Sequence, residues 1–164
     1  DAFERLPVCY CHHDAHRRNL LDRQLPNGDS EIVAVDWALT GFGRLGEEVG
    51  VTTAVSLEFL EVPATQADEL DQAIFTGYLA GLRDAGWQGD PRLARLGYAT
   101  NAFVLVGADF AWLEDLHTQE GKTLIESIIG LPLDTIIEQW AEMWPFILKL
   151  GDEALALRKL SLGV

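Results

Sequence analysis

The segment Leu25-Pro26-Asn27-Gly28-Asp29 constrains the fold most, because it forces the chain to reverse direction between two apolar stretches. Proline fixes φ and Asn-Gly tolerates positive φ, which is the chemistry of a tight turn. Before the turn, Leu20-Leu21-Asp22 predicts a short strand, and after it Ile32–Asp36 predicts an apolar strand that ends in a carboxylate. We therefore expect a β-hairpin that folds Asp36 back toward the residues that precede Leu20.

The loop over residues 12–19 reads His-His-Asp-Ala-His-Arg-Arg-Asn and follows an extended entry strand that we expect over residues 5–11. Asp14 can orient an attacking hydroxyl group and accept its proton. Asn19 offers a neutral amide oxygen, and Asp36 offers a carboxylate from the neighbouring strand. These are hard oxygen ligands, suited to a Mg²⁺ ion held mainly by substrate phosphates and water. Taken singly, the same residues are also ordinary turn formers.

This loop, with its spacing His-x-Asp-x-x-x-x-Asn, resembles the aminoglycoside phosphotransferase and choline kinase family. The loop of that family usually reads His-Gly-Asp-Leu-His-Pro-x-Asn. Its metal-binding Asp is followed by Trp or Phe, as in Asp36-Trp37 after the apolar strand. The segments Gly41-Phe42-Gly43 and Gly46-Glu47-Glu48-Val49 also resemble the family's segment after that Asp.

The resemblance implies a protein-kinase-like fold and transfer of the ATP γ-phosphate to a hydroxyl group of a small molecule. It implies that Asp14 is the catalytic base and that Asn19 and Asp36 hold Mg²⁺ and, through it, the nucleotide. His12 would brace the loop, and His16 would approach the γ-phosphate. Aminoglycosides, macrolides, choline-like amines and sugars stay open as acceptors, and GTP stays open beside ATP.

Two departures from the family pattern bear on substrate and rate more than on the class of reaction. His13 stands where the family usually has Gly, and Arg17-Arg18 stand where it has Pro and a small residue. Arginines beside a phosphate site form favourable charge-assisted hydrogen bonds. Alternatively, both arginines point into solvent.

A kinase of this type also needs a nucleotide-binding lobe, with a loop over the phosphates and a strand that carries a lysine. The sequence contains no glycine-rich phosphate loop followed by such a strand, and Lys122, Lys149 and Lys159 fall in helical or late regions. We therefore expect residues 1–164 to be a single domain, the C-terminal catalytic lobe of a longer kinase-like protein, inactive without the other lobe.

The composition narrows the choice of partners. Twelve basic and 26 acidic residues give a net charge of −14, which argues against a nucleic-acid partner. The charge is compatible with a cationic small substrate, and equally with a role in solubility alone. Cys9 and Cys11 lie two residues apart on one strand, which is poor disulfide geometry and favours reduced thiols in a cytoplasmic protein. No apolar run is long enough for a membrane span.

The remaining sequence predicts helices, so the expected fold class is mainly α with a small β-hairpin region (α+β). Gly41 to Gly46 is expected to be loop because of its glycines. Thr65 is expected to cap the second helix, and Pro145 to kink the fifth. The expected helices span residues 47–62, 65–86, 92–116, 122–129, 134–150 and 152–161.

Alternative functions remain open. His12, His13 and His16 can be interpreted as a zinc cluster of a metal-dependent hydrolase. A kinase-like lobe that only binds a ligand or a partner is another alternative. Trp112, with Asp109, Glu114 and Asp115, either lines a pocket for an amine cation or belongs to the core and a solvated helix end. Trp140 and Trp144 are expected in the core, and Glu47 and Glu48 are expected to start a helix through the helix dipole.

Overall fold

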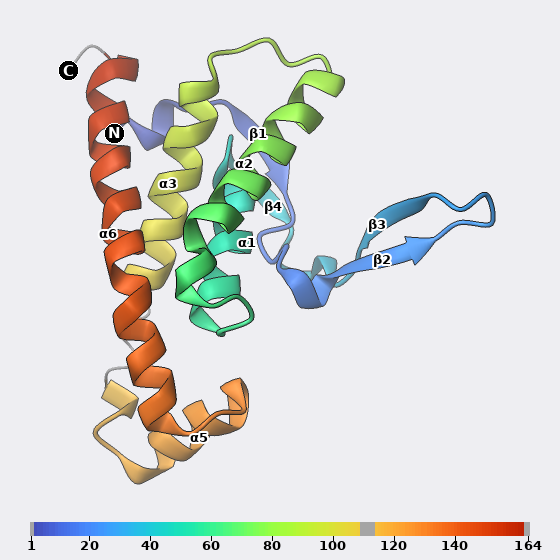
Figure 1. The fold of residues 1–164 in the computed structure, drawn as a ribbon. Coiled ribbons are helices and arrows are strands. Elements are labelled where there is room, and N and C mark those ends of the chain that lie inside the picture. Colours follow the sequence, from blue (N-terminus) through green and yellow to red (C-terminus); the bar gives the residue numbers. More distant parts are fainter. Residues whose placement is uncertain (1, 109–113, 163–164) are drawn as a thin grey trace.

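The computed structural model describes residues 2–108 and 114–162 (Figure 1). Helices dominate, and the strands form two small sheets of two strands each. The expected class, mainly α with a small β region, is therefore confirmed. No helix in the described part of the chain is long and apolar enough to cross a membrane.

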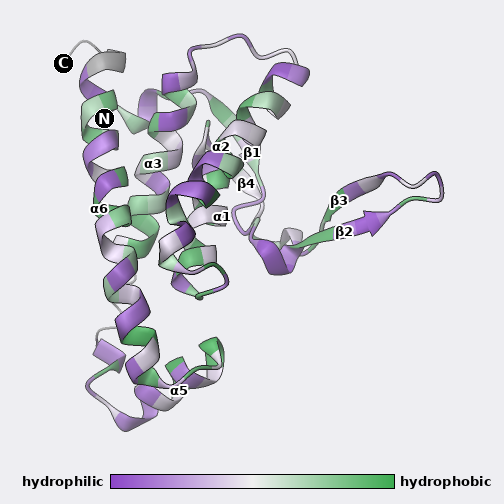
Figure 2. Cartoon of the chain, in the orientation of Figure 1, coloured by the Kyte–Doolittle hydropathy of each residue, from purple (hydrophilic) through white to green (hydrophobic). Residues whose placement is uncertain are grey.

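The predicted hairpin consists of β2 (Leu20–Gln24) and β3 (Ser30–Ala34), which pair antiparallel with Leu20 opposite Ala34. It projects away from the helices (Figure 1). Gly28 has φ of +90° and its N–H donates to Leu25 O at 3.0 Å, as the turn chemistry predicts. The base of the hairpin is apolar and the part toward the turn is mainly hydrophilic (Figure 2). The second strand begins and ends two residues earlier than predicted.

The other sheet pairs β1 (Val8–Cys11) with β4 (Gly41–Arg44). The entry strand is shorter than expected, because a 3₁₀ turn occupies residues 3–5. The expectation of a loop from Gly41 onward was wrong for β4. A Cβ on Gly43 would lie 2.8 Å from His13 Cε1 and 2.9 Å from Cys11 Sγ. The glycine therefore makes room for neighbouring side chains beside a paired strand.

Five labelled helices follow the first strands, together with short 3₁₀ turns, and their bounds differ from the prediction at several points. The first helix ends four residues early. Thr65 lies inside a 3₁₀ turn and does not cap the second helix. The helices are α1 (Glu47–Glu58), α2 (Ala67–Asp84), α3 (Pro91–Ala108), α5 (Gln119–Ile129) and α6 (Leu133–Leu162), and the 3₁₀ turns are η1 (Phe3–Arg5), η2 (Arg17–Asn19), η3 (Trp37–Leu39) and η4 (Ala64–Gln66).

The last two predicted helices are one continuous helix, α6, with Pro145 inside it. Residues 143, 146, 147 and 150 are buried in the core, and this packing offsets the hydrogen bond that the proline cannot donate. Gly151, which falls between the two predicted helices, lies inside α6 against a side chain. A Cβ on Gly151 would come within 2.8 Å of the Phe103 ring.

The core lies mainly between α1, α3 and α6, and glycines let α1 approach α3 closely. A Cβ on Gly97 would lie 1.9 Å from Leu45 O, and one on Gly46 would lie 2.0 Å from Ala94 O. Gly46 also has φ of +89°, which a side chain disfavours. The core cluster comprises Ala54, Leu57, Ala67, Tyr98, Ala99, Ala102, Val106, Met143, Phe146, Ile147 and Leu150.

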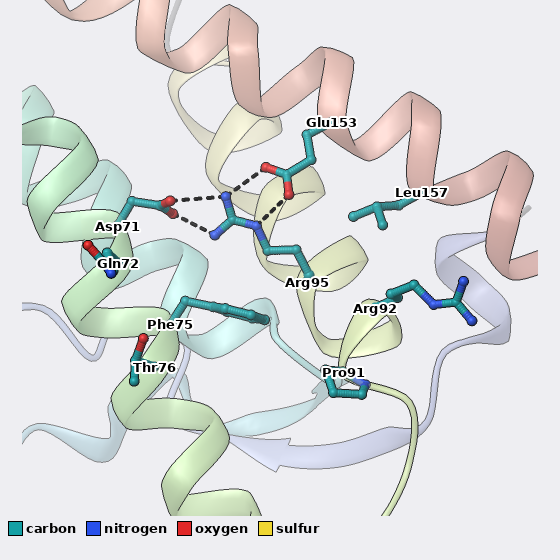
Figure 3. Close-up of a pocket in the computed structure, with 9 residues that line it drawn as sticks. All are labelled: Asp71, Gln72, Phe75, Thr76, Pro91, Arg92, Arg95, Glu153 and Leu157. Carbon is teal, nitrogen blue, oxygen red and sulfur yellow. Dashed lines mark hydrogen bonds and ion pairs between the residues drawn. The ribbon is translucent and has the colours of Figure 1, made fainter.

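Arg95 joins three helices through one partly buried guanidinium group (Figure 3). It lies on α3 and is 12% exposed, with hydrogen bonds to Asp71 of α2 and Glu153 of α6 between 2.6 and 3.0 Å. Its guanidinium carbon also lies 5.0 Å from the Phe75 ring centroid. Burial alone would lower the pKa of Arg95, but the two carboxylates raise it above its ordinary value. These residues line a cavity of about 420 Å³.

The close contact at Gly97 generates a prediction about stability. Gly97→Ala forces a Cβ against Leu45 O, so we expect a loss of about 3 kcal/mol from overpacking. Gly77→Ala is the matched control, because Gly77 lies inside α2 and an added Cβ there would meet no atom within 4 Å outside the nearby backbone of its own helix. That change should stabilise the protein by about 0.5–1 kcal/mol through helix propensity. Urea unfolding measures both, and equal effects of the two substitutions would contradict the packing described.

Candidate functional site

His12 connects the loop to the chain that leaves the hairpin. Its side chain is 5% exposed, and its Nε2 lies 2.7 Å from Val35 O. The imidazole also packs against the Trp37 ring, with centroids 4.6 Å apart. Trp37 in turn donates its indole N–H to Ala34 O at 3.1 Å. His12 therefore braces the start of the loop against the end of β3.

The loop brings Asp14, His16 and Asn19 into direct contact. Asn19 Nδ2 donates to Asp14 Oδ2 at 2.7 Å and to Asp14 O at 3.0 Å. His16 Nε2 lies 3.4 Å from Asp14 Oδ1. Asp14 is one-third exposed, so its carboxylate is both hydrogen-bonded and accessible from solvent. A carboxylate that is both oriented and accessible is compatible with general-base chemistry.

The hairpin register places Asp36 near the same cluster. Val35 N–H donates to Asn19 O at 2.9 Å, which continues the pairing by one step beyond Leu20 and Ala34. Asp36 is the next residue, with φ of +59° and an exposed side chain. A non-glycine residue held in this left-handed conformation is uncommon and tends to occur at functional sites.

Two side chains of helix α1, Glu48 and Thr52, hydrogen-bond the backbone of the loop. Neither was predicted from the sequence as a residue of the site. Glu48 accepts hydrogen bonds from the backbone N–H groups of His12 and His13 through one carboxylate oxygen. Thr52 Oγ1 donates to Ala15 O. The sequence carried no separate signal for Glu48, because two acids at the start of a helix are already explained by the helix dipole.

His13 adopts φ of +64°, a backbone conformation that glycine adopts without strain. The histidine at this position is therefore held in a conformation that its side chain disfavours. The His13 ring lies over β4, and its Nδ1 is 3.7 Å from Glu47 Oε1. Cys9 and Cys11 are free thiols beside it, with sulfur atoms 3.6 Å apart. Burial raises the pKa of both thiols above the ordinary value of 9.0.

By their chemistry, the amide oxygen of Asn19 and the carboxylate of Asp36 are ligands suited to a magnesium ion. Asn19 uses its amide nitrogen toward Asp14, so its Oδ1 faces away from that bond and is available as a ligand. The exposed Asp36 carboxylate makes no capping bond to its own turn. One amide oxygen and one carboxylate suit Mg²⁺ whose remaining ligands are phosphate oxygens and water.

The sequence also offered a zinc cluster and a tryptophan-lined pocket as alternatives. Among residues 2–108 and 114–162, no three His, Cys, Asp or Glu side chains form a group that could hold a metal ion, so a zinc cluster of the loop histidines finds no support there. Asp109 and Trp112 lie outside the described residues. Trp140 and Trp144 are partly buried against the main core, as expected.

Comparisons of the chain with models of protein families, with curated proteins and with solved structures found no match. Function is therefore inferred from the geometry of the loop and from its sequence pattern.

The contacts of Glu48 predict its contribution to stability. Glu48→Ala leaves two backbone N–H groups without their acceptor, which should cost about 2–3 kcal/mol. Glu48→Gln keeps an oxygen at the same place and should cost about 1 kcal/mol, the difference between a charged and a neutral acceptor. Urea unfolding midpoints measure both. Equal losses in the two variants would show that the carboxylate does not act as this acceptor.

The buried thiols predict how stability depends on pH. In the unfolded chain both cysteines lose their protons near the ordinary value of 9.0, whereas in the folded protein burial raises both pKa values, so the thiols keep their protons to higher pH. The unfolded state then binds fewer protons, so the free energy of unfolding falls as pH rises above about 8.5. Thermal unfolding between pH 7 and 10 should show this decline, and Cys9→Ser/Cys11→Ser should flatten it. An unchanged slope in the double variant would contradict the assignment.

Proposed function

We propose that this chain is the catalytic lobe of an ATP- or GTP-dependent kinase that phosphorylates a hydroxyl group of a small molecule. The observation that carries the proposal is the cluster of Asp14, His16 and Asn19, joined by the hairpin register to Asp36. Each of these residues also stands at the matching position of the phosphotransferase pattern described above. A site that only binds a ligand has no need of Asp14, Asn19 and Asp36 together.

In this proposal the acceptor hydroxyl lies against the Asp14 carboxylate, which orients the hydroxyl and accepts its proton as the oxygen attacks the γ-phosphate. The hydrogen bond from Asn19 Nδ2 keeps that carboxylate in one orientation. Asn19 Oδ1 and Asp36 would hold Mg²⁺, which supplies positive charge to the phosphates when bound. His16, whose Nε2 lies 3.4 Å from Asp14 Oδ1 and whose side chain is 16% exposed, would hydrogen-bond a phosphate oxygen.

The reaction also needs a nucleotide-binding lobe, which another part of the polypeptide or a second chain would supply. The net charge of the chain bears on which acceptor it would bind. The excess of acidic residues, with a formal net charge of −14, favours a cationic acceptor such as an amine-bearing sugar or an amino alcohol.

Substitution of the base tests the proposal. In the intact protein, Asp14→Asn should slow phosphate transfer by about 10²–10⁴-fold, the contribution typical of a general base. Nucleotide affinity should change little, because Asp14 holds neither the phosphates nor the metal. Transfer from radiolabelled ATP and GTP to a panel of amino alcohols and amino sugars measures the rate, and calorimetry measures the affinity.

Two companion variants sharpen the result. Asp22→Asn removes a carboxylate from the exposed face of β2 and should leave transfer unchanged. Asp36→Asn should weaken the Mg²⁺-dependent part of nucleotide affinity instead. Full activity of the Asp14→Asn variant would rule out the assignment, and absence of turnover by the wild-type protein across the panel would favour a non-catalytic binding module.

A further inference from the structure

Arg18 lies at the centre of the candidate site's short turn. It is the middle residue of η2, between His16 and Asn19. Its backbone N–H donates to His16 Nδ1 at 3.4 Å, and the Asn19 N–H donates to His16 O at 2.9 Å. The position of Arg18 in this turn therefore affects the positions of His16 and Asn19.

The Arg18 side chain leaves the loop and reaches the segment after α1. Its Nε donates to Glu61 Oε1 at 3.2 Å, and its guanidinium carbon lies 5.2 Å from the centroid of the Phe59 ring. The Glu61 side chain is 11% exposed, whereas that of Arg18 is 55% exposed. The pair is thus shielded from water on one side, which makes it stronger than a fully exposed ion pair.

The segment that receives Arg18 is itself fixed at several points. The Glu61 N–H donates to Ser56 O at 3.0 Å. Leu60 has φ of +55°, a conformation that leucine keeps only where its surroundings impose it. Trp140 of α6 donates its indole N–H to Glu58 O at 2.8 Å. The end of α1 is therefore a fixed support against which the loop can be positioned.

We propose that Glu61 is a positioning residue for phosphate transfer: through Arg18 it fixes η2 and so sets the orientation of Asn19 and His16 toward bound phosphates. The inference rests on the proposed function, because those two residues have this task only in a phosphotransferase. Glu61 lies 43 residues from Arg18 in sequence and contacts neither Asp14 nor Asn19 in the hydrogen bonds described. Its described link to the site is the ion pair with Arg18.

Direct phosphate binding by Arg18 is the competing role. The structure favours the positioning role, because Nε is hydrogen-bonded and the guanidinium group lies against Phe59. Exchange of the two charges separates these roles. A brace survives when Glu and Arg trade places, whereas a phosphate ligand is lost when residue 18 becomes acidic.

The experiment compares Arg18→Glu, Glu61→Arg and the double variant in the intact protein. Arg23 and Glu31 provide the matched control, since this cross-strand ion pair of the hairpin carries the same charges at 63% and 40% exposure, outside the loop. Nuclear magnetic resonance of the His16 imidazole reports the geometry of η2. Water relaxation by Mn²⁺ in the presence of ATP reports metal binding, and transfer assays report the rate.

We expect each single reversal at 18 or 61 to shift the His16 signals and to raise the half-saturating Mn²⁺ concentration by about 10–100-fold, as for residues that orient metal ligands. The double variant should largely restore the wild-type His16 signals and Mn²⁺ affinity. Charge reversals at Arg23 and Glu31 should change neither the His16 signals nor the Mn²⁺ affinity. Unchanged His16 signals in both single variants would overturn the inference.

Single-variant losses that the double variant does not recover would also overturn it and would assign Arg18 to phosphate binding. The His16 signals need no catalysis. Their response therefore tests the brace even where the wild-type protein transfers no phosphate, an outcome that would count against the proposed function instead.

Discussion

The close backbone contact between the start of α1 and the middle of α3 is the constraint on which the rest of the structure depends. Leu45 O and Gly97 approach so closely that a single methyl group on the glycine would not fit, and Gly46 faces Ala94 O in the same way. The start of α1 is therefore fixed by backbone atoms, which cannot yield by changing a rotamer. Because α1 begins at Glu47, directly after this contact, the contact also fixes where Glu48 and the rest of the helix lie relative to the loop.

Because α1 is fixed in this way, the loop of the candidate site that it contacts is fixed as well. Glu48 and Thr52 lie one turn apart on α1 and hold the backbone of residues 12, 13 and 15. The end of the same helix leads to the segment that receives Arg18. The loop is thus held at its start by α1 and at its end by the segment that follows α1, while its central residues keep their side chains for other partners. Such support from a packed element is what keeps a catalytic side chain within a narrow range of positions.

The sequence predicted the parts of this arrangement that depend on local chemistry. The turn at Gly28 and the hairpin on either side of it involve residues close together in the chain. The strand at Gly41–Arg44 was missed, since its glycines indicate a loop unless the side chains that pack over them are known. Likewise Glu48 lies 36 residues from the amide it binds, so no local pattern indicates the pair. The continuous α6 depends on core packing around Pro145, which periodicity alone does not reveal.

The charge around the loop explains why phosphate chemistry here would require a divalent cation. Asp14 and Asp36 carry negative charge at the accessible side, and Glu47 and Glu48 lie beneath the loop. Glu61 also offsets the charge of Arg18. An anionic nucleotide phosphate would be repelled by such a site unless a cation came with it. Under the proposed function, Asn19 and Asp36 would supply the hard oxygen ligands that Mg²⁺ prefers, and the carboxylates around them are a second reason, beside the resemblance of the loop, to expect a metal there.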